Sequence, residues 1–187
     1  MRIMTSIGML LTLSACTTTE TVEHPPAIKM AAEAPTEENI EKQIEDLQAL
    51  ARKHPTIPEP HTRLGTIYEK LRYYELAEEE YRTALELSER SDKGQYTGPL
   101  FDLGRVLTKR ERFQEARPQL QAVLDIKPAN PRLLFRNTDY RDAAYLLGMI
   151  AKGENKPQEA SDFFQRYVDY GGDRANVAAY LLPPSTR

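Results

Sequence analysis

The residue types that most often perform chemistry in proteins are scarce in this chain of 187 residues. It has one cysteine, Cys16, and three histidines, His24, His54 and His61, which do not have the spacing of metal ligands. No glycine-rich loop precedes a helical segment in the way that would hold a phosphate. The acidic run from Glu75 to Glu80 has the pattern of a solvated helix face. These features predict no catalytic centre, no metal and no cofactor, and we do not expect an enzyme.

The first 15 residues have the composition of a secretory signal peptide. Arg2 supplies a positive charge, and residues 3–13 are mostly apolar. The apolar stretch is too short to cross a bilayer as a helix. We therefore expect residues 1–15 to be removed during export.

The segment Leu13-Ser14-Ala15-Cys16 resembles a bacterial lipobox. The resemblance implies that Cys16 becomes the N-terminus and is acylated, so that no thiol nucleophile remains. A lone cysteine forms no intramolecular disulfide, and lipidation gives this thiol a role. Because Thr17 and not Asp follows, the resemblance also implies the periplasmic face of the outer membrane. The alternative is an ordinary cleaved signal beside an incidental cysteine. Residues 16–36 are expected to be a flexible tether, because they are rich in Thr, Pro, Ala and Glu.

A pattern of four positions occurs three times between Pro58 and Tyr170. In each unit a Leu-Gly pair is followed by an alanine 13 residues after the leucine, and by a large residue four positions later. The three sets are Leu64-Gly65, Ala77 and Tyr81; Leu103-Gly104, Ala116 and Leu120; and Leu147-Gly148, Ala160 and Phe164. Each unit has two segments with apolar residues at helical spacing. We predict antiparallel helix pairs that touch at the glycine and the alanine and that are stable only when stacked.

This pattern resembles the tetratricopeptide repeat. The resemblance implies an all-α, right-handed solenoid of helix-turn-helix units over residues 37–187. We expect a half-repeat at 37–55, repeats at about 58–91, 97–130 and 139–172, and a capping helix at 173–182. Residues 129–140 form an insert relative to the repeat length.

Three prolines help to place the helix starts. Pro60 suits the first turn of a helix, and Pro157 is expected to open the second helix of the third unit. Pro118 is tolerable if its helix begins near Glu115, because the first N–H groups of a helix have no partner within it.

Composition limits the function classes. The 25 basic and 28 acidic residues give a net charge of −3, and nucleic-acid binding proteins normally carry a basic face. With 13 prolines, 9 glycines and no alternating apolar runs, a sheet is not expected. The residues after residue 36 are enough for one domain with a core.

The family resemblance also implies a binding groove. In such proteins the inner, concave wall is lined by the first helix of each unit. The matching positions here are Thr62, Thr66, Glu69 and Lys70; Phe101, Arg105, Thr108 and Lys109; and Asp142, Tyr145, Met149 and Lys152. The family's chaperone-binding members carry Lys and Asn where this chain has Thr62 and Thr66, so their carboxylate-terminated ligand is in doubt here.

Three of the groove positions are expected to be apolar and solvent-facing: Phe101, Tyr145 and Met149. With Arg105, Lys109 and Lys152 beside them, they predict a peptide ligand with an apolar anchor and an acidic flank. The alternative is that the insert or the C-terminal helix covers these side chains.

We therefore interpret the chain as a lipid-anchored adaptor or scaffold that binds protein partners in assembly or maintenance of the bacterial envelope. Known lipoproteins of similar build include pilotins, outer-membrane assembly factors and adaptors of murein-trimming proteases. The alternatives are a murein-acting envelope enzyme or its accessory subunit, and a structural lipoprotein without a specific partner.

Overall fold

The computed structural model of the protein describes residues 37–90, 97–126 and 138–182. Cys16, the signal peptide, the tether and residues 129–137 of the insert lie outside these ranges, so the predictions made for them stay predictions. The described ranges contain helices and turns and no strand. The helices are α1 (Glu37–Lys53), α2 (Glu59–Lys70), α3 (Tyr74–Arg90), α4 (Thr97–Lys109), α5 (Phe113–Asp125), α6 (Thr138–Gly153) and α7 (Pro157–Asp169), followed by the 3-10 turns η2 (Arg174–Asn176) and η3 (Ala178–Tyr180).

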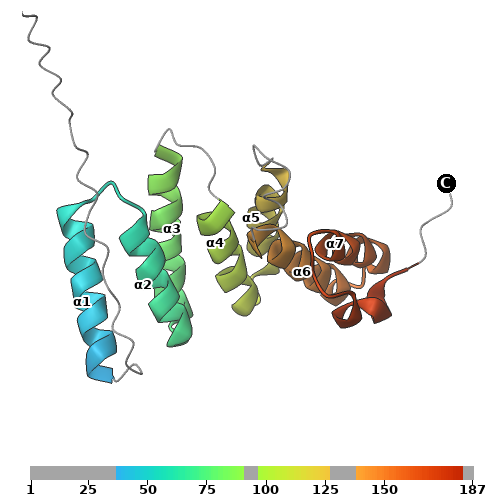
Figure 1. Ribbon diagram of the computed structural model, residues 1–187, viewed down its shortest axis with the longest axis horizontal. Helices are drawn as coiled ribbons and strands as arrows, with labels where there is room; N and C mark the ends of the chain where they lie inside the picture. The colour runs from blue at the N-terminus through green and yellow to red at the C-terminus, as the bar shows by residue number, and fades with distance from the viewer. Residues whose placement is uncertain (1–36, 91–96, 127–137, 183–187) are drawn as a thin grey trace, which may run out of the picture. The chain divides into compact units, whose positions relative to one another are not determined.

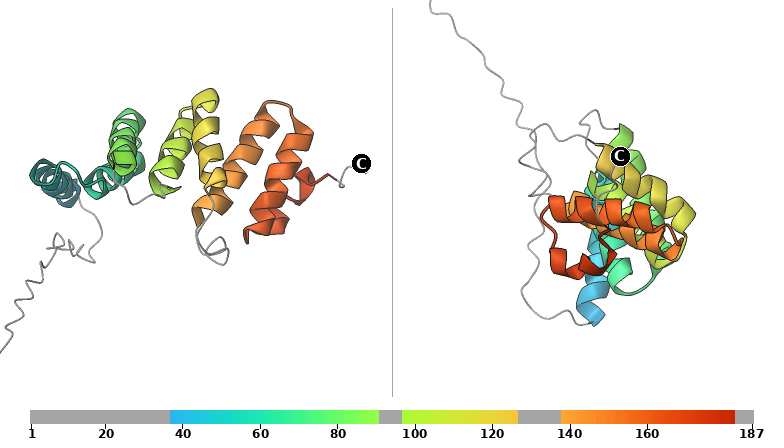
Figure 2. Two further views of the ribbon diagram at one scale, coloured as in Figure 1. Left: turned by 90° about the horizontal axis from the view of Figure 1, so that it is seen from above. Right: turned by 90° about the vertical axis from the view of Figure 1, so that its right-hand side faces the viewer.

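The α-helices pack in chain order, each against the next (Figures 1 and 2). Three antiparallel pairs, α2 with α3, α4 with α5 and α6 with α7, correspond to the three units of the sequence pattern. The first helices of the last two units, α4 and α6, also contact each other. One continuous apolar core runs from Ala77 and Tyr81 to Val177. Stacking therefore buries what a single pair would leave exposed.

The glycines of the pattern lie where the two helices of each pair touch. A Cβ atom built on Gly65 would lie 2.6 Å from the Tyr81 ring, and one on Gly104 would lie 2.7 Å from the Leu120 side chain. At Gly148 the corresponding contact is 2.6 Å from the Phe164 ring. Real side chains do not approach so closely, so the large residue of each unit occupies the space that the glycine leaves. The predicted close approach is confirmed at the three glycines, where the nearest atoms belong to the large residue of each unit and not to its alanine.

The turn inside each pair places a non-glycine residue in the left-handed region. Arg72, Glu111 and Asn155 have φ of 64°, 59° and 59°. In each turn the N–H of this residue donates to the carbonyl three residues earlier, and the next N–H donates to the carbonyl five residues earlier. This is the Schellman arrangement, which satisfies the last carbonyls of a helix. The three turns are thus equivalent in conformation although their side chains differ.

Two expectations about the helices were wrong in detail. Residues 173–182 form two 3-10 turns and not one helix, although Val177 is fully buried against the last unit. The reversal begins at Gly171, whose φ of 89° favours glycine. Helix α5 begins at Phe113, two residues before the expected start, so Pro118 lies inside it. The N–H that proline lacks would have bonded the carbonyl of Gln114, which is in an exposed residue. Pro157 does open α7.

None of the described helices is both long enough and apolar enough to cross a membrane.

Candidate binding site

The structure corrects the predicted apolar wall. Phe101 is 7 % exposed and belongs to the core, and the guanidinium of Arg105 lies 5.1 Å from its ring centroid. Tyr145 is half-buried, and its ring packs 6.0 Å from that of Phe164 and 5.3 Å from that of Tyr167. Phe101 is thus part of the core, and the ring of Tyr145 is covered by α7 of its own unit. Of the three, Met149 alone is exposed, at 38 %.

The predicted cations fall into two separate pockets. The first, which we call the α2–α4 pocket, has a volume of about 170 Å³ and is lined by Thr66, Glu69, Lys70, Arg105 and Lys109. The second, which we call the C-terminal pocket, has a volume of about 190 Å³. It is lined by Lys152, Asn155, Lys156, Pro157, Ala160, Ala179, Tyr180 and Leu182.

A buried carboxylate organises the α2–α4 pocket. Glu69, on α2, is 8 % exposed. From α4, the Nε and Nη2 atoms of Arg105 donate to its two oxygens at 3.0 and 2.7 Å. The Nζ atom of Lys109 lies 2.8 Å from Oε1. From α3, the hydroxyl of Tyr81 donates to Oε2 at 2.9 Å. Glu69 therefore links three helices and fixes both cations.

The two carboxylates that pair with Arg105 have pKa values that are shifted in opposite directions. Burial by itself raises the pKa of Glu69, but hydrogen bonds from Arg105 and Lys109 outweigh burial and bring it to about 2. Asp102 lies 2.8 Å from Nη2 of Arg105. Burial, with repulsion from Asp139 and Glu69, raises the pKa of Asp102 to about 6 in spite of that cation. Glu69 has additional donors in Lys109 and Tyr81, which explains why it keeps its charge more strongly.

The two threonines predicted for the groove bond to the backbone of their own helix. The hydroxyl of Thr62 donates to the carbonyl of Pro58 at 3.3 Å, and that of Thr66 to the carbonyl of Thr62 at 2.9 Å. Thr66 lines the α2–α4 pocket, whereas Thr62 does not. Because both threonine hydroxyls donate to the backbone, the cations are the side chains of this surface that are suited to bind a ligand.

In the C-terminal pocket, Lys152 lies against an aromatic side chain. Its Nζ donates to the hydroxyl of Tyr180 at 2.8 Å and lies 4.2 Å from the ring centroid. The Tyr180 ring packs 5.3 Å from Phe164. Lys156, also at the pocket, lies 2.8 Å from Glu154. A short C-terminal turn and the first turn of α7 thus form a basic pocket with an apolar floor.

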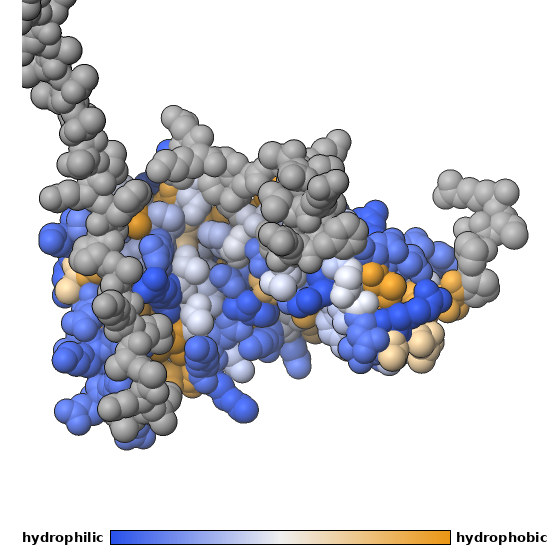
Figure 3. All heavy atoms as spheres, viewed as in Figure 1, coloured by the Kyte–Doolittle hydropathy of each residue, from blue (hydrophilic) through white to orange (hydrophobic). Residues whose placement is uncertain are grey.

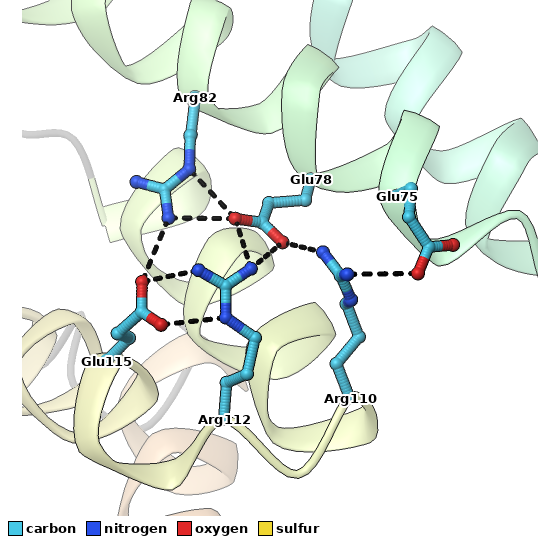
Figure 4. A network of polar contacts seen from close by, with 6 residues as sticks. All are labelled: Glu75, Glu78, Arg82, Arg110, Arg112 and Glu115. Carbon is cyan, nitrogen blue, oxygen red and sulfur yellow. Dashed lines mark hydrogen bonds and ion pairs between the residues drawn. The ribbon is translucent and has the colours of Figure 1, made fainter.

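An ionic cluster between the first two units was not predicted from the sequence (Figure 4). Its centre is Glu78, on α3, which is 8 % exposed at its side chain. It accepts hydrogen bonds from Arg82, from Arg110 and from Arg112. We call this cluster, which also includes Glu75 and Glu115, the first clasp.

The next pair of units carries an ionic cluster at equivalent positions, with the charge inverted at its central residue and at that residue's partner in the following turn. Arg117 on α5 donates to Glu154 and to Glu159, both at 2.6 Å. We call this group the second clasp. Glu78 and Arg117 each directly follow the alanine of their unit, and Arg110 and Glu154 each lie six residues after the glycine of theirs. Comparing equivalent positions between units is the signal that would have revealed both clasps.

The described residues hold no group of acidic, histidine or cysteine side chains that would bind a metal ion. His61 instead contacts Glu80, with 2.7 Å between Nδ1 and Oε2.

Comparisons with known proteins agree with this architecture. Residues 56–129 match the model of the tetratricopeptide repeat. Among solved structures, MamA 41-end from Desulfovibrio magneticus RS-1 is similar, with a TM-score of 0.57 and 25 % identity over 71 % of this chain and 67 % of that chain. A crystal structure of MamA superposes with a TM-score of 0.58 at 18 % identity, over 76 % of this chain and 72 % of that chain.

A structure from work on pilF of Pseudomonas aeruginosa superposes with a TM-score of 0.60 at 22 % identity, over 77 % of this chain and 59 % of that chain. At such identities the likeness shows the fold alone. No curated protein matches the sequence. The repeat match and these superpositions confirm the predicted fold class: the described chain is an all-α solenoid of the tetratricopeptide type, a fold that points to protein–protein interaction.

Proposed function

We propose that this protein is an adaptor that binds acidic segments of a protein partner at the α2–α4 pocket. The observation that carries the proposal is that Lys70, Arg105 and Lys109 line one pocket together with a single carboxylate, Glu69, which binds the last two of these cations. The formal charges of the lining residues sum to about +2, and Asp102, which lies 2.8 Å from Arg105 outside the lining, lowers the local charge to about +1 at neutral pH. The excess positive charge favours an anionic ligand.

The pocket is preorganised for such a ligand. Glu69 and Tyr81 hold Arg105 in place, so less side-chain freedom is lost on binding. Lys109 has a side chain that is 45 % exposed, so it keeps donors that a partner can reach. Charge-assisted hydrogen bonds from these groups to a carboxylate are stronger than neutral ones.

The corrected apolar wall changes the expected ligand. Since Phe101 and Tyr145 pack within the array, recognition at this face depends on charge more than on an apolar anchor. Affinity should therefore fall as salt rises, because exposed charges are screened.

Nothing in the pocket favours catalysis. Asp102, whose raised pKa would suit an acid catalyst, is 16 % exposed at its side chain, and it lines neither pocket. Its raised pKa follows from burial next to other carboxylates, which is a structural cause. Residues 37–90, 97–126 and 138–182 therefore offer no observation in support of the murein-acting alternative.

The setting of the adaptor is a second part of the proposal. The sequence Leu13-Ser14-Ala15-Cys16 supports acylation of Cys16, and two or three acyl chains are enough for stable anchoring. With Thr17 next, the same signal favours the periplasmic face of the outer membrane. The adaptor would then serve assembly or maintenance of the envelope.

Replacing Cys16 tests the anchor. The Cys16→Ala variant should leave the membrane fraction or accumulate with its signal uncleaved, because no thiol remains to be acylated. Mass spectrometry of the wild type should show an acylated Cys16 at the N-terminus, and any other mature N-terminus rules out the anchor.

Replacing Lys109 tests the binding function. Lys109→Gln should lower the yield of the protein that crosslinks to the wild type in detergent-solubilised envelopes, by about fivefold for the loss of one exposed charge contact. Lys42→Gln, on α1, removes the same charge away from the pocket and should have no effect. Equal yields from the two variants, both with wild-type melting temperatures, would reject the α2–α4 pocket.

A further inference from the structure

Each junction between units uses equivalent positions. The residue after the unit's alanine, Glu78 in the first unit and Arg117 in the second, binds side chains of the following unit. In the third unit this residue is Ser161, whose hydroxyl accepts the N–H of Leu182 at 2.8 Å. The C-terminal turns therefore occupy the place that a fourth unit would take.

A second equivalent position, four residues after the glycine, carries ion pairs in the first unit, whereas in the second unit it is Thr108, whose hydroxyl donates to the carbonyl of Gly104. Glu69 lies four residues after the glycine of its unit, and it binds Arg105 and Lys109 of the following first helix. Lys152 is the equivalent residue of the third unit. In the part of the chain that the structure describes, Lys152 contacts the neutral hydroxyl and the ring of Tyr180. The end of the array thus presents a cation where the first junction places a carboxylate and its partners.

We propose that the C-terminal pocket is a second partner site, which takes a carboxylate side chain together with a neighbouring apolar side chain from an acidic protein segment. Lys152 and Lys156 would bind the carboxylate. Pro157, Ala160 and Leu182 would contact the apolar group. This site shares no residue with the α2–α4 pocket, so the two proposals stand or fall separately.

The size of the pocket determines the class of ligand. Its volume of about 190 Å³ exceeds that of a few waters but falls below the range of about 300–1,000 Å³ that is typical of small-molecule and cofactor sites. One or two side chains fit that space. Leu182 is 44 % exposed, and at this end of the array apolar residues lie among hydrophilic ones, whereas α1 at the other end is mostly hydrophilic (Figure 3). Exposed apolar surface of this kind usually marks an interaction site.

Charge supports an acidic ligand over a basic one. Glu154 and Glu159 are shared between Arg117 and Lys156. With Lys152 added, the local group holds three cations and two carboxylates, a formal charge of about +1. A carboxylate would neutralise this excess, and the ammonium of Lys152 would exchange a neutral partner for a charged one, which makes a stronger bond.

The dipeptide acetyl-Glu-Leu-amide is the probe, and acetyl-Gln-Leu-amide is its uncharged control. In an NMR titration of the protein, the charged probe should shift the amide resonances of residues 158–160 and 178–182 with a dissociation constant of about 1–10 mM. The uncharged probe should bind about fivefold more weakly, as expected for one exposed ion pair. Lys152→Gln should weaken the charged probe to the same extent, and Lys152→Arg should restore it.

Two results would overturn the inference. One is equal binding of the two probes, since the site would then not distinguish a charged side chain from an uncharged one. The other is an unchanged dissociation constant in Lys152→Gln when its spectrum otherwise matches the wild type. Lys42→Gln serves as the charge-matched control and should bind both probes as the wild type does. Shifts confined to residues around Arg105 would also overturn it, while leaving the α2–α4 pocket supported.

Discussion

At the scale of single residues, close packing between paired helices depends on the absence of a side chain at three glycines. The Cβ of any substituent at Gly104 would lie 2.7 Å from Leu120, which is itself fully buried. The neighbouring atoms belong to a core residue and not to a flexible surface chain. The structure therefore offers little room for the pair to adjust.

Gly104→Leu should lower the free energy of unfolding by about 1–3 kcal/mol, because overpacking forces side chains or helices apart. Urea denaturation measures this change. Gly153→Ala is the control, since a Cβ there meets nothing within 4 Å, and it should be neutral or slightly stabilising. If Gly104→Leu unfolds at the same urea concentration as the wild type, the pairing of α4 with α5 is wrong.

The ionisation of Asp102 makes the free energy of unfolding depend on pH. Its pKa is about 6 in the folded protein against an ordinary value of 3.8, so the folded chain binds more protons between these values. The contribution of Asp102 to stability therefore declines as pH rises from about 4 to 6. Asp102→Asn cannot ionise, so relative to the wild type it should gain about 2 kcal/mol between about pH 4 and 7.

Glu69 provides the contrast for that experiment. Its pKa is depressed to about 2, so its stabilising contribution is complete above its unfolded pKa and is lost only as pH falls toward 2. The ionisation of Glu69 itself therefore adds no pH dependence between pH 5 and pH 7. Glu69→Gln should be destabilised at both pH values, and less so at pH 7, because loss of the repulsion from Glu69 lowers the pKa of Asp102. A stability difference between Asp102→Asn and the wild type that does not change between pH 4 and 7 would contradict the raised pKa of Asp102.

At the scale of helices, the inverted clasps specify which unit follows which. An acidic Glu78 matches the basic turn of the second unit, and a basic Arg117 matches the acidic turn of the third. An exchanged order would place like charges together. We infer that the clasps select neighbours, while the apolar core supplies most of the stability.

Glu78→Gln should lower the free energy of unfolding by about 1–3 kcal/mol, because Arg110 and Arg112 would lose a mostly buried charged partner. Glu75→Gln is the matched control. Its side chain is 74 % exposed although it also pairs with Arg110, so its effect should stay within about 0.5 kcal/mol. Equal effects from both substitutions in urea denaturation would show that burial of Glu78 does not matter.

The sequence predicted the helices and their pairing better than it predicted which side chains are exposed. Spacing alone located the helix pairs and the glycine contacts, because both depend on offsets within one unit. Phe101 lies in the core, and Tyr145 packs on two rings of α7 in its own unit. These contacts depend on the three-dimensional packing of side chains, which the offsets of the repeat positions do not reveal. The two clasps join residues more than thirty positions apart. The ending as 3-10 turns follows from local backbone geometry after Gly171, where the apolar spacing still resembled a helix.

At the scale of the whole molecule, the array presents two basic pockets on a chain whose net charge is negative. Both pockets lie at or beside the first helix of a unit. In the α2–α4 pocket, the carboxylate of Glu69 holds Arg105 and Lys109 in fixed positions. An adaptor with two such sites would contact an extended acidic partner more strongly than one site alone, because the second contact becomes intramolecular.

Site-specific photo-crosslinking in living cells tests the central claim that the α2–α4 pocket binds a protein partner. A photoreactive residue at Lys70, which is exposed at that pocket, should give a discrete crosslinked product. The same residue at Glu79, exposed on α3, should give none. Adding Lys109→Gln to the Lys70 variant should reduce the product. A product from Glu79 with none from Lys70 would contradict the proposal that this pocket is the binding site.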